Sequence, residues 1–358
     1  MPPVAYTVAF LVPASLVAGL LLGGPWAWAT LIFVFVLTPG LDAALGRDER
    51  NAGAAEEAAR LANPWFDVVL RAWVPIHLGL LVWAAWAVSL GGRPLLDTVG
   101  LTVSTGVMTA AGINVAHELM HRKARRDRAL AEVLMTLATY PHFCVEHVLG
   151  HHRNVATPED AASARLGESV YGFVPRSIVG GVRSAWRLER HRATERGEAG
   201  TLRDRRVRYA LDVALLHVGA FALGGGAALA FVAAQGLVAV VHLEIINYVE
   251  HYGLQRERLP SGRYERVQPR HSWNSAHRLT GLYLFGLPRH ADHHFLASRP
   301  YAVLRHHPGA PQLPAGYATM LLLTLAPPLW RRAMDPRVRA LGGEQVADRA
   351  PGAVMHEA

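Results

Sequence analysis

The sequence has one cysteine, few charged residues and no basic leader. A single cysteine, Cys144, excludes a disulfide framework, and it excludes thiolate zinc sites and iron–sulfur clusters built from this chain alone. We expect Cys144 to be a small buried hydrophobic residue. The first residues, 1–4, lack the basic region of a secretory signal, so the first apolar run is expected to remain as a membrane span.

The shortage of charge indicates a membrane protein. Charged residues make up 18% of the 358 residues and hydrophobic residues 51%, whereas about a quarter of an ordinary soluble domain is charged. We therefore expect an all-α fold, an integral membrane bundle of about six transmembrane helices, as one domain over residues 1–335 with a loosely ordered C-terminal tail over 336–358. Apolar runs of suitable length lie at 4–22, 25–41, 66–90, 95–116, 209–223 and 227–248.

The distribution of arginine predicts the orientation. Glycine-rich breaks separate the spans in pairs, at 23–25, 91–94 and 224–226. These breaks hold one basic residue, Arg93, whereas residues 176–208 hold ten arginines and four acidic residues. Because cytoplasmic loops accumulate Lys and Arg, both termini and the long connections are predicted to be cytosolic. The glycine turns are expected on the other side of the membrane.

Two further apolar segments do not fit as spans. A crossing by residues 129–141 would place His121 and His147 on opposite faces, so this segment is predicted to be an interfacial or half-inserted helix that stops at Pro141. Residues 321–326 are too short to cross a membrane.

Nine of the nineteen histidines form clusters with the spacing of metal ligands. His117 and His121 close the fourth span, and residues four apart lie on one helix face about 6 Å apart. The same spacing gives His147 and His151 a common face while His152 points elsewhere, and it predicts one face for the three histidines of 290–294. The nine expected ligands are His117, His121, His147, His151, His152, His251, His290, His293 and His294.

Nine ligands are too many for one ion, so the site is predicted to hold two. Imidazole suits zinc, copper, iron or nickel, so the spacing alone does not name the metal. Nearby carboxylates are expected to orient the imidazoles by accepting their N–H groups: Glu118, Glu146, Glu250 and Asp292. Structural hydrogen bonding is the expected role of the histidines inside spans: His77, His217 and His242. The roles of His271, His277 and His306 stay open.

These motifs resemble the membrane-bound alkane 1-monooxygenases, the integral-membrane di-iron hydroxylases of bacteria. The family pattern of HExxH, EHxxGHH, NYxEHYG and RHxxHH is met at 117–121, 146–152, 247–253 and 289–294. Two positions depart from the usual pattern, Pro288 and Ala276. The related xylene and cymene methyl hydroxylases share the same histidines.

The resemblance implies two non-haem iron ions, dioxygen as co-substrate and a medium-chain n-alkane that is hydroxylated at its terminal carbon to a 1-alkanol. It also implies rubredoxin, or a ferredoxin-type protein, as an electron donor that docks on the basic cytosolic face. The expected location is the bacterial inner membrane, with the metal site cytosolic, and nucleic acid is not an expected partner.

Several other functions fit parts of the same pattern. An aromatic methyl monooxygenase of the xylene or cymene type is the main alternative, and a membrane acyl desaturase or lipid hydroxylase shares the histidine clusters. HExxH alone is also the signature of zinc proteases, in which Glu118 would be the general base. A zinc protease would leave most of the clustered histidines unused. A metal transporter would instead have its ligands along a transmembrane path.

Overall fold

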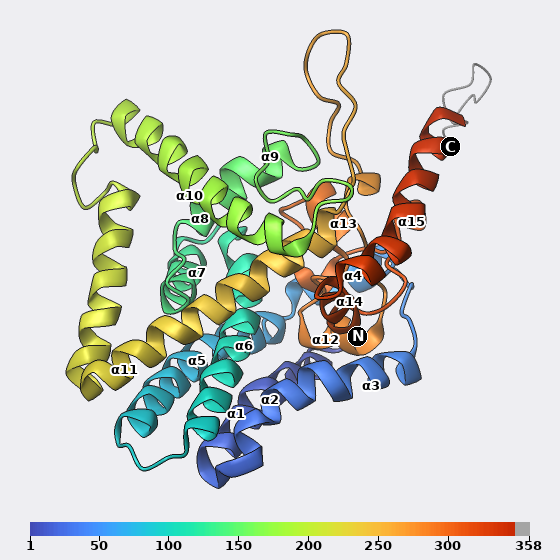
Figure 1. The fold of residues 1–358 in the computed structure, drawn as a ribbon. Coiled ribbons are helices and arrows are strands. Elements are labelled where there is room, and N and C mark those ends of the chain that lie inside the picture. Colours follow the sequence, from blue (N-terminus) through green and yellow to red (C-terminus); the bar gives the residue numbers. More distant parts are fainter. Residues whose placement is uncertain (348–358) are drawn as a thin grey trace.

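Long apolar helices dominate the structure, a computed structural model that describes residues 1–347 (Figure 1). Within these residues, five helical stretches are long and apolar enough to cross a membrane. Three are the helices α5 (Trp65–Ser89), α6 (Leu95–Met120) and α11 (Arg205–His251). The other two are composite: η1 (Pro3–Phe10) with α1 (Leu11–Leu22), and η2 (Gly24–Trp28), α2 (Ala29–Ile32), η3 (Phe33–Leu37) and α3 (Thr38–Leu45). The described part of the chain contains no β-strand, which confirms the all-α prediction.

A break in α11 divides it into the last two predicted spans. Gly224 and Gly225 leave the helical conformation, and the chain bends sharply there (Figure 1). A side chain on Gly224 would place its Cβ 2.2 Å from the Cβ of Ser89 in α5, so only glycine fits at this approach. Gly225 has a φ of 61°, in the left-handed region that favours glycine. The bend separates the apolar runs 209–223 and 227–248, as the sequence predicted.

The glycine breaks and the histidine clusters lie at opposite ends of the bundle. The turns after α1, after α5 and within α11 are along the lower edge of Figure 1, and the connections that carry histidines are at the other end. This separation agrees with the predicted arrangement. The side of the membrane that each end faces stays a prediction.

The two short apolar segments are not spans. α7 (Arg125–Leu137) has 13 residues and is fixed to α5 by Asp127, whose carboxylate accepts from the Arg71 guanidinium at 2.8 Å. The helix ends before Pro141, as an interfacial helix was expected to do. α14 (Tyr317–Thr324) has eight residues, far fewer than a membrane crossing needs.

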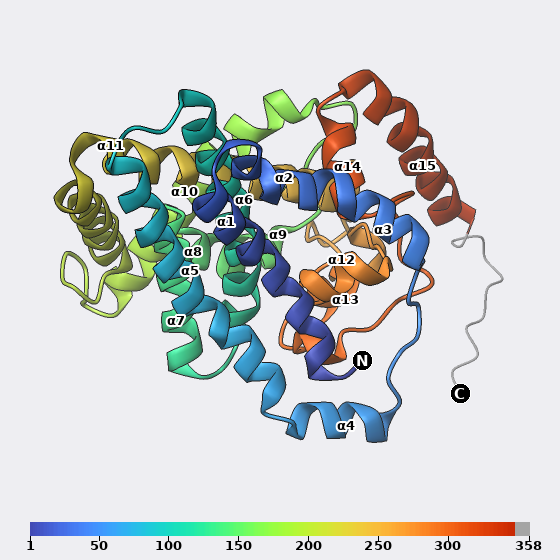
Figure 2. The ribbon, with the colours of Figure 1, turned by 90° about the horizontal axis from the view of Figure 1, so that it is seen from below.

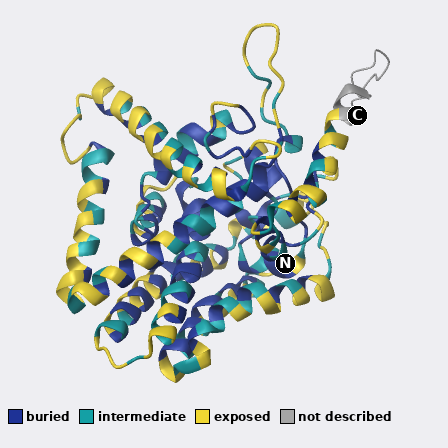
Figure 3. Ribbon diagram, in the orientation of Figure 1, coloured by how far each residue is buried: buried dark blue, intermediate teal, exposed yellow. Residues whose placement is uncertain are grey.

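Several short elements and the long helix α10 cover the histidine end of the bundle. They are α4 (Ala54–Ala62), α8 (Phe143–Glu146), η4 (His147–His151), α9 (His152–Asn154), α10 (Val170–Glu195), η5 (Pro269–His271), α12 (Arg278–Tyr283), α13 (His290–Phe295) and η6 (Tyr301–Val303). Figure 2 shows α12 and α13 between α1 and the C-terminal helices. In Figure 3 the buried residues run through the centre of the bundle and into these covering elements. The covering elements thus close one end of the membrane bundle.

The C-terminal helix begins inside the predicted domain and continues past its boundary. α15 spans Pro327–Ala347, so residues 336–347 are helical where a loosely ordered tail was predicted. The rest of that predicted tail, 348–358, lies outside the described residues. Trp330 of α15 is fully buried and its ring packs on those of Tyr248 in α11 and Tyr252 directly after it, with centroids 5.1 and 5.3 Å away. This aromatic contact gives the helix a packed partner that its polar sequence did not reveal.

Candidate metal centre

Four separate parts of the chain bring the nine predicted ligands together. The C-terminal turn of α6 carries His117 and ends at His121, and α11 ends at His251. The segment of η4 and α9 supplies three histidines, and α13 supplies the last three. Two compact sets result, and in each set the possible ligand atoms lie within 4.8 Å of one another. One set is His117, His121, His147, His152 and His293, and the other is His151, His251, His290 and His294.

The five-histidine set converges through its Nε2 atoms. The Nε2 of His152 lies 3.1 Å from that of His147 and 3.0 Å from that of His293. The Nε2 atoms of His117 and His121 are buried and have no hydrogen-bond partner in the described residues. Five nitrogens that face one another in this way form a cradle for a cation.

The four-histidine set has the same character. The Nε2 of His294 lies 3.0 Å from that of His290 and 3.3 Å from that of His151. The Nε2 of His251 lies 3.3 Å from that of His290. These four side chains are all buried, so bulk water does not supply hydrogen bonds to their closely spaced nitrogens.

A π-turn assigns the histidines of 147–152 to different sets. We predicted that His147 and His151 share a face; their rings do stack, with centroids 5.2 Å apart, but the two residues belong to different sets. Residues 147–151 form a π-helix, in which the backbone bonds join residues five apart. His147 therefore meets His152 at i+5, while His151 turns toward the four-histidine set. π-turns of this kind recur at functional sites.

α13 also divides its histidines. The sequence predicted one face for His290, His293 and His294, but only His290 and His294 lie in the same set. Their i, i+4 relation keeps them together, whereas His293, at i+3, reaches the five-histidine set. The helix thus lies between the two sets and supplies both.

The protonation state of these histidines suits a metal. Burial lowers the pKa of His147, His152, His290, His293 and His294 well below the usual 6.5, and it lowers the pKa of His121 to about 4. The rings are therefore neutral at pH 7, with a free lone pair. A neutral imidazole has one N–H, so hydrogen bonds cannot join every crowded Nε2 pair at once. A bound cation satisfies all of them together.

Asp160 orients His151, and the sequence reasoning did not assign it this role. Its Oδ2 accepts from Nδ1 of His151 at 2.9 Å and from the Ser163 hydroxyl at 2.6 Å, and its Oδ1 accepts from the Ala162 backbone N–H at 3.1 Å. Burial lowers the pKa of His151, but the Asp160 charge and hydrogen bond outweigh it and raise that pKa to about 9. The sequence feature that could have identified Asp160 is its position in a polar loop, eight residues after His152.

Only one of the four predicted carboxylates contacts a clustered histidine. Glu250 Oε2 lies 3.2 Å from Nε2 of His290, on the side of the ring that faces the set. Among the described residues, the hydrogen bonds of Glu118 go to Arg122 and the Tyr301 backbone, and those of Asp292 go to Arg299, His307 and the Arg305 backbone. Glu146 is buried beside Gly150 and has no hydrogen bond to a clustered histidine.

The remaining histidines lie outside the two sets. His77 pairs with the Thr109 hydroxyl at 3.0 Å, and Nδ1 of His217 bonds to the Val213 carbonyl at 2.8 Å, which agrees with structural roles. His271 contacts Glu265 and His277 contacts the Ser275 hydroxyl. Cys144 is buried, as expected.

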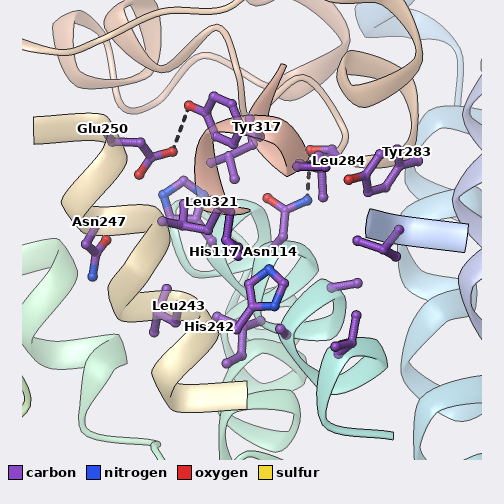
Figure 4. Close-up of a pocket in the computed structure, with 18 of the residues that line it drawn as sticks. Asn114, His117, His242, Leu243, Asn247, Glu250, Tyr283, Leu284, Tyr317 and Leu321 are labelled. Carbon is purple, nitrogen blue, oxygen red and sulfur yellow. Dashed lines mark hydrogen bonds between the residues drawn. The ribbon is translucent and has the colours of Figure 1, made fainter. Parts of the chain in front are cut away.

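An apolar cavity leads from the histidine sets into the bundle (Figure 4). His117, His147 and His290 line one end, so both sets border it. The Tyr317 hydroxyl donates to Glu250 Oε1 at 2.9 Å at this end. The rest of the wall is mainly apolar and comes from α1, η3, α6, α11 and α14, with residues that include Val12, Val34, Val107, Ala111, Leu243 and Leu321.

Comparison with known proteins gives a consistent answer. The family model described as fatty acid desaturase matches residues 95–324. Alkane 1-monooxygenase 2 of Pseudomonas aeruginosa is 45% identical over 319 residues, which cover 88% of this chain and 85% of that protein. Alkane 1-monooxygenase 2 of Alcanivorax borkumensis is 39% identical over 335 residues, 92% of this chain and 88% of that protein.

A more distant relative is the xylene/toluene monooxygenase hydroxylase component of Pseudomonas putida. It is 29% identical over 336 residues, which cover 90% of this chain and 85% of that protein. The two unusual residues do not affect the ligands, since Pro288 and Ala276 are both outside the histidine sets. From its identity to the curated relatives, its match to the desaturase model and its apolar helices, this chain is a membrane protein that belongs to the alkane 1-monooxygenase family.

Proposed function

We propose that this protein inserts one oxygen atom from dioxygen into a terminal C–H bond of a medium-chain n-alkane, giving a 1-alkanol, and that it holds two non-haem irons. The observation that carries the proposal is the apolar cavity that ends at both histidine sets. A substrate without polar groups needs an apolar path, and a metal-dependent oxidation needs the ligands at the end of that path. The names of the curated relatives support the same reaction.

The two sets offer one iron position each. Five imidazoles surround one position; four imidazoles and the neighbouring Glu250 carboxylate surround the other. Imidazole with carboxylate is a donor set that suits iron. Bound iron would supply the activation of dioxygen for attack on the C–H bond. The chain itself orients the ligands, through Asp160 on His151 and through the π-turn of η4.

The cavity wall positions the alkane and excludes water. Its apolar residues come from several membrane helices, so the substrate can enter from the lipid and lie along the bundle. Asn114 is fixed by its side-chain amide, which donates to the Leu284 carbonyl at 2.8 Å. Asn114 and Glu250 are engaged in hydrogen bonds with other protein groups, and most of the remaining wall is apolar, which disfavours a water cluster along the path. The reacting carbon is thereby held in a dry environment next to the histidine sets.

An external protein must supply electrons. We infer a rubredoxin that docks on the basic face of α10, where Arg183, Arg187 and Arg190 are exposed. An acidic donor is attracted to such a face, and the attraction weakens as salt is added. The same arginines would face the cytosol in the inner membrane of a bacterium, since positive residues accumulate there.

The test is turnover of octane and of p-xylene by iron-loaded protein in nanodiscs, under labelled dioxygen, with a rubredoxin and its reductase. Labelled 1-octanol as the main product supports the proposal. Faster formation of labelled methylbenzyl alcohol would assign the chain to the aromatic methyl hydroxylases, and an unlabelled alkene would make it a desaturase. His147→Ala should abolish turnover, whereas the exposed His191→Ala should retain it.

A further inference from the structure

A second apolar hollow lies away from the histidine sets, between α5, α7 and the first half of α11. Its volume is about 650 Å³, and none of the nine clustered histidines lines it. In Figure 1 this half of α11 stands at the edge of the bundle, on the side of α7 and α5. Apolar side chains form most of the wall: Leu81, Ala85, Leu137, Leu216, Ala220 and Val232. We call this hollow the α7–α11 groove.

The groove opens toward the lipid. The outward residues of the same half-helix are strongly exposed: Leu211, Leu215, Val218 and Phe221. Exposed leucine and phenylalanine on a helix of spanning character face acyl chains in a bilayer. Ordered water is not expected along the apolar part of this wall, since water there would lack polar partners. A hydrocarbon chain is the occupant that fits such a wall.

The mouth of the groove carries charges of both signs. Glu132 accepts from the Arg208 guanidinium at 2.6 Å, lies 3.4 Å from Nε of Arg205 and accepts from the Tyr209 hydroxyl at 2.8 Å. Two guanidinium groups thus share one carboxylate, which leaves one net positive charge. Basic pockets between membrane helices on the cytoplasmic side are typical sites for lipid head groups.

Asp212 adds a carboxylate one helical turn from Arg208. It lines the groove and has no hydrogen-bond or ion-pair partner among the described residues. An unpaired carboxylate in a membrane helix is costly and indicates a binding role. At the i, i+4 spacing the two side chains lie about 6 Å apart on one face. The mouth therefore offers a cation and an anion side by side.

We propose that the α7–α11 groove binds one aminophospholipid of the ethanolamine type. One acyl chain fills the groove, the phosphate lies against Arg208 and Arg205, and the ammonium group donates to Asp212. A choline head group has no N–H to donate to Asp212. A glycerol head group carries no cation, so it leaves the Asp212 carboxylate unpaired.

A glycine in the wall provides a variant that blocks the groove without a clash. Gly219 lines the groove, and a Cβ built on it meets no heavy atom within 4 Å. Gly219→Leu therefore adds an apolar side chain to the groove wall at a position where its Cβ displaces no neighbour. The matched control is Gly40→Leu, because Gly40 in α3 also has nothing within 4 Å and lines none of the cavities described above.

Native mass spectrometry of the protein released from nanodiscs tests the proposal. In discs of mixed ethanolamine, choline and glycerol phospholipids, we expect the parent protein and Gly40→Leu to retain one ethanolamine lipid per chain. Gly219→Leu should lose it, and Asp212→Asn should reduce the preference for ethanolamine over choline at least fivefold. Equal retention of all three lipids, or unchanged retention in Gly219→Leu, would overturn the assignment. An alkane or a second copy of the chain in the groove, in place of lipid, would do the same.

Discussion

Removal of the Asp160 carboxylate is the sharpest probe of how the four-histidine set is held. In Asp160→Asn the side chain keeps its shape, but the charge that faces Nδ1 of His151 is lost. Burial lowers the pKa of His151, but that charge, with the Glu146 and Glu250 carboxylates, outweighs burial and raises this pKa to about 9. Loss of such an orienting partner typically weakens metal binding about 10- to 100-fold. Since the pair is fully buried, we expect an effect near the upper end for one of the two metals.

The assay is competition with a chelator, followed by the number of metal ions retained per chain. Asp160→Asn should lose one ion at chelator concentrations that leave the parent protein with two, and Glu159→Gln, an exposed neighbour, should behave as the parent. Ser163→Ala removes one of the donors to Asp160 and should give a smaller loss. If Asp160→Asn retains both ions with unchanged affinity, the orienting role is wrong.

Three further predictions concern the ligands, the cavity and pH. His251→Ala should lose metal and all turnover, whereas His191→Ala should lose neither, as measured by metal analysis and octane oxidation; retained activity in His251→Ala would remove that residue from the ligand set. Ala111→Phe narrows the apolar cavity. The oxidation rate of the longest accepted alkane should therefore fall at least tenfold, while the rate with the shortest alkane is kept. Unchanged rates across alkane chain lengths would contradict the assigned substrate path. Burial lowers the pKa of His142 and His121 to about 4, so the unfolded chain binds more protons than the folded chain between pH 4 and 6.5. The unfolding temperature of metal-free protein, followed by tryptophan fluorescence, should therefore fall as the pH is lowered through this window. An unfolding temperature that does not change with pH would contradict this reasoning.

The sequence predicted the helical bundle and the nine clustered histidines because both depend on local patterns. Apolar runs of spanning length identify the membrane helices, and i, i+4 spacing identifies His117 with His121 and His290 with His294. The division of the ligands into two sets was not predictable in this way. It depends on the π-turn at 147–151, which moves His152 by one position relative to a regular helix.

Long-range contacts explain the other differences. Asp160 was not recognised because its role depends on a loop that folds back on His151, and no periodic pattern marks such a loop. α15 continues as a helix beyond residue 336 because Trp330 and its neighbours pack on α11, whereas the sequence of that region is polar and contains Pro336, Gly342 and Gly343. Side chains buried by a distant element have no local signature.

The segment of η4 and α9 and the helix α13 each carry ligands of both histidine sets. An ion that enters either set therefore fixes a backbone that also bears ligands for the other. The second ion then meets imidazoles whose conformational entropy is already reduced, so it binds more tightly than the first. We therefore expect metal loading of this protein to be cooperative, so that chains with two ions or none dominate over chains with one.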